Sequence, residues 1–146
     1  MFRLRNAAGA MFALGALLVL APAAQADTIK LAATLSGKNE VPPVQTPANG
    51  SAEMTLDTAS RTLTWTVTFQ GLSAELRAAH FHGQASMTEN APIVVPIAKR
   101  DDKSPFKGSK VLTPEQVEAL LAGRWYINVH TATHPPGEIR GQVVRQ

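Results

Sequence analysis

The stretch RTLTWTVTF, residues 61–69, decides the fold class, because apolar and threonine side chains alternate along it without a break. Leu63, Trp65, Val67 and Phe69 fall on one side of an extended chain, and the threonines fall on the other. β-branched and aromatic residues favour strands, so this stretch predicts a half-buried β-strand. Weaker strand patterns occur at residues 28–35, 50–57 and 92–97, and residues 57–60 predict a hairpin loop between the strands at 50–57 and 61–69.

One helix interrupts this pattern, in LTPEQVEALLAG, residues 112–123. Thr113 is the expected N-cap, Pro114 takes the first helical position, Gln116 completes a capping box, and Gly123 follows the last turn. The polar run at residues 99–110 is expected to be a mobile surface loop. Residues 124–130 and 138–144 predict two closing strands. About seven short strands with one short helix indicate an all-β fold, a Greek-key-like antiparallel sandwich or barrel, with the helix as a cap over an open end.

The N-terminal segment, residues 1–26, has two arginines, an apolar run and the small-residue sequence Ala24-Gln25-Ala26. This order is typical of a secretory signal peptide. Cleavage would leave one domain, residues 27–146, in the periplasm or outside the cell, with no further segment suited to a membrane. The net charge would fall from +3 to +1, since 12 basic residues would remain against 11 acidic ones. The small charge gives no support to a nucleic-acid partner. The absence of cysteine excludes disulfides.

The four histidines of the chain, His80, His82, His130 and His134, lie in two segments. His80 and His82, in AAHFHG, share one face of a predicted strand, and Phe81 points to the core. In RWYINVH, residues 124–130, the same rule places His130 on the non-core face. The non-core faces of these strands and of residues 138–144 each present polar side chains: His80, His82, Tyr126, Asn128, His130, Glu138, Arg140 and Gln142. If the strands are neighbours, these side chains form one polar patch.

Neutral imidazoles are common ligands of zinc and copper, and a strand holds two of them in fixed positions. His80, His82 and His130, with His134 as a further candidate, therefore predict a metal site supported by Tyr126, Asn128, Glu138 and Arg140. A purely structural hydrogen-bond network is the alternative interpretation. For Glu138 and Arg140, a mutual salt bridge or the anchoring of a neighbouring loop is expected rather than chemistry.

The order of NEVPPV (39–44), AAHFHG (78–83), VLTPEQVEALLAG (111–123) and YINVHTATHPPGEIRGQ (126–142) resembles the CHRD domain, first described in chordin and common in exported bacterial proteins. The resemblance covers nearly all of residues 27–146 and implies an extracellular binding protein rather than an enzyme. Family positions corresponding to His80, His82, His130, Glu138 and Arg140 are its usual polar signature, whereas His134 departs from it. A looser similarity is to the Cu/Zn superoxide dismutase sandwich, which also has an HxH strand, but the zinc loop and the disulfide are missing.

Three functions remain open at this point. The first is a non-catalytic exported domain that binds copper or zinc, and the second is a structural or protein-binding module without a metal. The third and weakest is copper-dependent redox chemistry such as superoxide dismutation. The sequence shows no pairing of a nucleophile with a base and no phosphate-binding loop, so hydrolase and nucleotide-binding functions rank low. The partner and the oligomeric state are not defined by these patterns.

Overall fold

Nine antiparallel strands and two short helices make up the described part of the chain, residues 27–146, of this computed structural model. The predicted signal peptide, residues 1–26, lies outside the described residues. The elements are β1 (Thr28–Ser36), the 3-10 helix η1 (Gly37–Asn39), β2 (Asn49–Asp57), β3 (Thr62–Gln70), β4 (Leu76–Gly83), β5 (Ile93–Lys99), β6 (Phe106–Val111), α1 (Pro114–Leu121), β7 (Trp125–Thr131), β8 (Ile139–Gln142) and β9 (Val144–Arg145).

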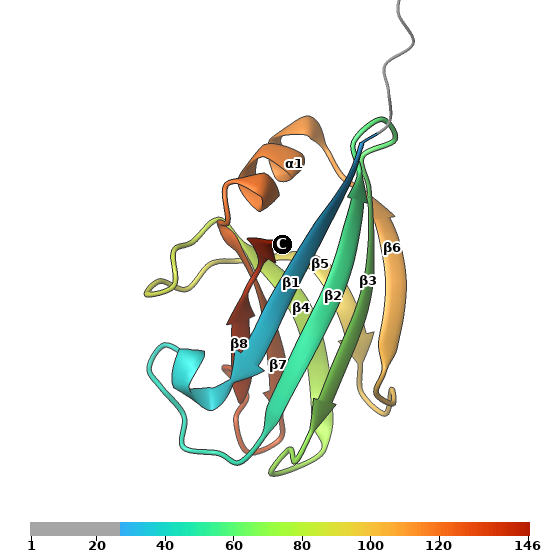
Figure 1. Cartoon of the computed structure of the whole chain (residues 1–146). Helices are drawn as coiled ribbons and strands as arrows, with labels where there is room; N and C mark the ends of the chain where they lie inside the picture. The colour runs from blue at the N-terminus through green and yellow to red at the C-terminus, as the bar shows by residue number, and fades with distance from the viewer. Residues whose placement is uncertain (1–26) are drawn as a thin grey trace, which may run out of the picture.

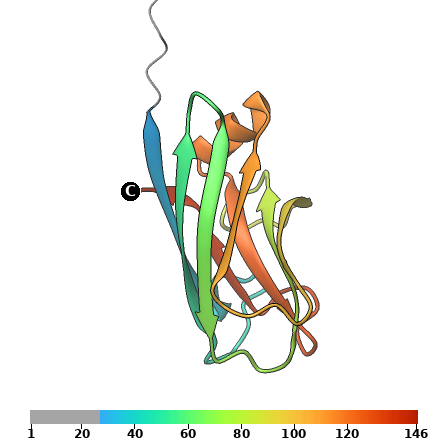
Figure 2. The ribbon, with the colours of Figure 1, turned by 90° about the vertical axis from the view of Figure 1, so that its right-hand side faces the viewer.

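The strands form one sheet in the order β5-β4-β7-β8-β1-β2-β3-β6, with β9 paired to β1. This sheet curls until its two end strands, β5 and β6, approach each other. Figure 1 shows the resulting barrel-like sandwich, and Figure 2 shows β1, β2 and β3 side by side as one wall with the C-terminal end beside β1. The predicted all-β class, an antiparallel sandwich or barrel with one short α-helix, is confirmed.

The hydrophobic core follows from the alternation in β3. Leu63, Trp65 and Val67 are buried there and lie opposite the buried Leu56, Met54 and Ala52 of β2. Burial of such side chains is the dominant favourable term in folding. Phe81 of β4 packs between two tryptophans, at ring-centroid distances of 5.3 Å from Trp65 and 5.8 Å from Trp125. The core therefore fixes the inward face of β4, and the two histidines that flank Phe81 must point the other way.

The helix forms as the sequence predicts. The side chain of Thr113 accepts a hydrogen bond from the Gln116 amide, and the Gln116 side chain accepts one from the Thr113 amide. Both bonds satisfy amides that lack partners in the first helical turn. Ala119 and Leu120 of α1 join the core. Figure 1 shows α1 across one end of the sheet, in agreement with its predicted role as a cap.

Two sequence-based expectations are wrong in detail. The run at residues 99–110, expected to be a mobile loop, contains most of β6, which pairs with β3 from Val67–Phe106 to Thr62–Val111. Residues 138–144, expected to be one strand, divide into β8 and the start of β9, with the buried Val143 between them. The described residues include no helix long and apolar enough to cross a membrane.

Candidate metal centre

The pairing of β4 with β7 brings three of the four histidines together. His80 lies opposite Asn128, His82 opposite Tyr126, and Ala78 opposite His130, so the three imidazoles share the face away from the core. The ring centroid of His80 is 5.1 Å from that of His130 and 5.6 Å from that of His82, and His82 is 5.6 Å from His130. One ligand atom from each ring lies within 4.8 Å of the others. The predicted convergence of His80, His82 and His130 is thus observed.

Backbone carbonyls set the tautomers of two of these rings. The Nδ1 atom of His82 lies 2.9 Å from the Ala91 carbonyl oxygen, and Nδ1 of His130 lies 2.9 Å from the Pro135 carbonyl oxygen. A carbonyl oxygen only accepts hydrogen bonds, so each Nδ1 must carry the proton. In the neutral rings Nε2 then keeps a free lone pair. A hydrogen bond from the second ring nitrogen to a carbonyl is the usual support of a metal-ligating histidine.

Three ring nitrogens of these histidines have no hydrogen-bond partner. Nε2 of His82, Nε2 of His130 and Nδ1 of His80 are buried and form no hydrogen bond with any described residue. A buried polar atom without a partner costs free energy. Three such atoms in one place, all of the same chemical type, indicate that something other than this part of the chain completes their contacts.

The electrostatics keep the three rings neutral. Burial, together with repulsion from His130 and His82, lowers the pKa of His80 from 6.5 to about 4. Burial also lowers the pKa of His82 and that of His130, in each case against an opposing hydrogen bond to a backbone carbonyl. Neutral imidazole is the form that binds a metal. At neutral pH the site therefore offers three lone pairs and no carboxylate or thiolate.

His134 is not part of this group. The three residues whose ligand atoms cluster are His80, His82 and His130. The backbone carbonyl of His134 instead accepts hydrogen bonds from the amides of Thr131 and Gly137. These bonds close the turn that presents the Pro135 carbonyl to His130, so the structure gives the His134 backbone a positioning role.

Tyr126 and Arg140 lie beside the histidines, but they are not on an open surface as the outward-facing patch implied. Tyr126 is 1% exposed and stacks on His82, with a centroid distance of 5.0 Å and an interplanar angle of 8°. The Tyr126 hydroxyl oxygen accepts a hydrogen bond from the Ala91 amide, whose carbonyl holds His82. On the other side of the Tyr126 ring from His82, the Arg140 guanidinium carbon lies 3.5 Å from the Tyr126 ring centroid.

Glu138 and Arg140 do not form the salt bridge that was one of the two expectations for them. Glu138 directly precedes β8 and bonds to the connections before β2 and β4, whereas Arg140 bonds to the connection between β4 and β5. Its carboxylate accepts hydrogen bonds from the hydroxyls of Thr46, Ser73 and Thr131 and from the Ser73 amide. Glu138 thus anchors loops, as the alternative expectation held. Burial acts to raise its pKa, but these bonds outweigh burial and the pKa is lowered.

Two residues of the site were not singled out in the sequence, Glu40 and Asn90. Asn128 donates to the buried Glu40 carboxylate at 3.3 Å. Asn90 accepts from Arg140 through its side-chain oxygen and donates to the Val41 carbonyl. Both lie on connections between strands, which carry no periodicity. The one available signal was a glutamate in the apolar and proline-rich setting of residues 39–44.

The fold and this site together define a class of protein: an all-β protein in which three imidazoles converge outside the hydrophobic core. The family model of the CHRD domain matches residues 31–143, which is most of the chain. The chain belongs to the CHRD domain family. No curated protein matches the chain.

Proposed function

We propose that this CHRD-domain protein is exported and binds one divalent transition metal ion, copper or zinc, through His80, His82 and His130. The observation that carries the proposal is the set of three buried, unpartnered ring nitrogens on one face of β4 and β7. A structural hydrogen-bond network would instead satisfy these atoms with partners from the chain.

The donor set fits such an ion. Zinc with imidazole ligands takes Zn–N distances of about 2.0–2.1 Å, and tetrahedral geometry then places the nitrogens about 3.3 Å apart. The ligand atoms of the three histidines lie within 4.8 Å of one another, so small movements of the side chains would complete the site. Three imidazoles without hard oxygen ligands favour zinc or copper over magnesium or calcium. Three protein ligands would leave a further position for water or another molecule.

The surrounding residues would hold the ligands in place. The carbonyls of Ala91 and Pro135 orient the rings of His82 and His130, and Tyr126 covers the face of His82. Rings that are already oriented lose little conformational freedom when an ion binds. The role supported by these contacts is binding, with the ion as part of the folded domain.

Calorimetric titration of the chelator-treated protein with Zn²⁺ and Cu²⁺ tests the proposal. We expect one site per chain, and an increase in the free energy of unfolding of about 3 kcal/mol when the free ion exceeds its Kd a hundredfold. The variant His82→Ala should lose this site. The matched control is His134→Ala, which removes a histidine outside the cluster and should bind like the wild type. Equal loss in both variants, or no site in the wild type, contradicts the proposal and favours a structural or protein-binding module.

Export is a separate part of the proposal and rests on residues 1–26. Recovery of the protein from the periplasm or medium, with an N-terminus at Asp27, would support it. A protein retained inside the cell with its first 26 residues in place would contradict it.

A further inference from the structure

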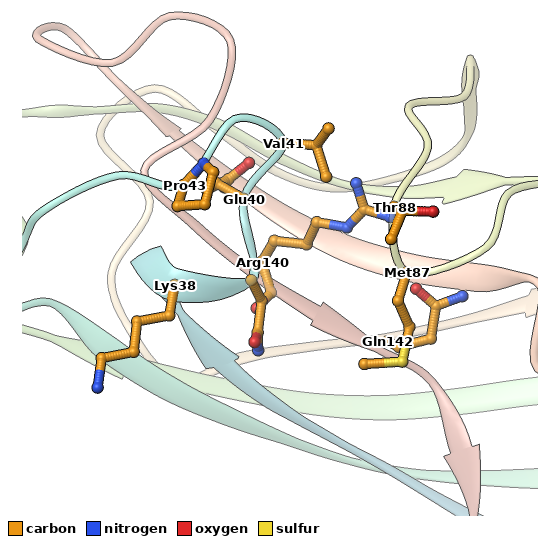
Figure 3. Close-up of a pocket in the computed structure, with 9 residues that line it drawn as sticks. Lys38, Glu40, Val41, Pro43, Met87, Thr88, Arg140 and Gln142 are labelled. Atoms are coloured by element: carbon orange, nitrogen blue, oxygen red, sulfur yellow. The ribbon is translucent and has the colours of Figure 1, made fainter.

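A pocket of about 400 Å³ is lined by Arg140, whose guanidinium lies over the Tyr126 ring beside the three histidines. One wall comes from η1 and the segment that follows it, and the other comes from the loop between β4 and β5. Figure 3 shows Arg140 between Glu40 and Val41 on one side and Met87 and Thr88 on the other. Pockets that bind small molecules have volumes of about 300–1,000 Å³.

Arg140 brings a buried positive charge to this pocket. Its side chain is 1% exposed, and its guanidinium donates only to neutral acceptors, the Asn90 side-chain oxygen at 3.1 Å and the Ser86 carbonyl at 2.9 Å. The one ion pair found among residues 27–146 joins Arg100 to Glu75, so no described carboxylate pairs with Arg140. A guanidinium has five N–H donors, and these two bonds leave others free. The nearby Glu40 carboxyl group attracts Arg140, but burial raises the pKa of Glu40 and no ion pair forms with the guanidinium, so an anion in the pocket would offset part of the cost of the buried charge.

Glu40 adds an unpartnered acid group. It is 5% exposed; one carboxyl oxygen accepts from Asn128, and the other, Oε1, is buried without a hydrogen-bond partner. Burial raises the pKa of Glu40 to about 7, although Asn128 and Arg140 oppose the rise. A protonated carboxyl group is a hydrogen-bond donor, and a ligand oxygen would satisfy it.

Most of the accessible surface of the pocket is apolar, although the polar residues Lys38, Asn39, Thr88 and Gln142 also line it. Val41 and Pro43 line one wall, and Met87, which is 66% exposed, lines the other. An exposed methionine beside a buried charge suits a ligand with one charged end and one apolar end. A simple inorganic anion would leave this apolar surface uncovered.

We propose that the pocket binds a small amphiphilic carboxylate, with its charged end toward Arg140 and Glu40 and its apolar chain against Val41, Pro43 and Met87. The site is distinct from the three histidines and needs no metal. A ligand with a positively charged end would be repelled by Arg140.

Titration of the purified protein with octanoate, followed by calorimetry and by amide NMR shifts, tests this inference. We expect saturable binding with the largest shifts at residues 38–43 and 87–88. Octylammonium has the same chain with the opposite charge, and acetate has the charge without the chain, so both should bind at least tenfold more weakly. Equal binding of octylammonium overturns the assignment of a carboxylate, and equal binding of acetate overturns the assignment of an apolar chain. No saturable binding of octanoate overturns the proposal as a whole.

Two exposed substitutions locate the site without disturbing the buried residues. Met87→Glu adds a negative charge at the pocket, whereas Val111→Glu adds the same charge on β6 at a residue of similar exposure, 58%. We expect Met87→Glu to weaken octanoate binding about tenfold and Val111→Glu to leave it unchanged. Equal affinities in the two variants contradict the proposed location. The variant His82→Ala should retain octanoate binding, which separates this inference from the proposed metal site.

Discussion

Replacement of Glu40 by glutamine should change how the stability of the metal-free protein depends on pH. Glu40 is buried, and burial raises its pKa from 4.5 to about 7, against the effects of Asn128 and Arg140. Between these two values the folded chain binds more protons at Glu40 than the unfolded chain does. The contribution of Glu40 to stability is therefore fully present below pH 4.5 and is lost as the pH rises through 7. One pKa unit is worth ~1.4 kcal/mol, so the rise from 4.5 to about 7 corresponds to a loss of at most about 3.5 kcal/mol.

Urea unfolding at pH 5 and pH 8, with chelator present, measures this difference. The histidines also titrate in this range, but they are the same in wild type and Glu40→Gln, so their effect cancels in the comparison. We expect the wild type to lose more unfolding free energy than Glu40→Gln between pH 5 and pH 8, by about 1–3 kcal/mol. Identical pH dependence in the two proteins would show that Glu40 is not held in its neutral form, and the donor role given to it in the pocket would then fail.

Three further substitutions test other parts of the structure by thermal or urea unfolding. Phe81→Ala should cost about 3–5 kcal/mol, because this fully buried ring contacts two core tryptophans; a loss below 1 kcal/mol would contradict its place in the core. Gly137→Ala should lower the melting temperature, since Gly137 has φ of 143° and an added Cβ would approach the Asn128 side-chain oxygen to 2.3 Å; an unchanged melting temperature argues against this packing. Glu138→Gln should destabilise the protein and reduce its loss of stability in acid, because the lowered pKa of Glu138 adds stability that disappears as the pH falls through the folded value. An equal acid response in wild type and variant would refute that role.

The inward faces of the strands could be predicted because their patterns are local. Alternation over residues 61–69 gave the buried positions of β3, and the capping residues gave the start of α1 at Pro114. β6 was not recognised because its sequence, FKGSKV, has only one buried side chain, Phe106. Its strand conformation depends on pairing with β3, which is a contact between distant segments. The periodicity of a strand indicates which of its side chains are buried, but it does not indicate which other strand it pairs with.

The polar site was predicted in part for the same reason. Strand parity placed His80, His82 and His130 on the non-core face, and the pairing of β4 with β7 brings them together. Parity did not predict that this face is itself buried. In β7 the alternation of exposure is absent, because Tyr126 and Asn128 are as buried as the core residues beside them. The residues that contact them, such as Glu40 and Ala91, come from connections whose path no periodicity reveals.

The distribution of unsatisfied polar atoms bears on whether this buried polar face is a structural network or a binding site. Among residues 27–146, seven buried side-chain polar atoms have no hydrogen-bond partner, and only Trp65 Nε1 belongs to the hydrophobic core. The other six belong to the polar face or to the loop over it: Glu40 Oε1, His80 Nδ1, His82 Nε2, Asn128 Oδ1, His130 Nε2 and Gln142 Oε1. In a hydrogen-bond network selected for stability alone, unsatisfied buried atoms would be scattered or absent, because each one costs about 1–3 kcal/mol. Their concentration around the histidines and the neighbouring pocket is what binding of an ion and a small molecule would require, and it favours binding over a purely structural role for this face.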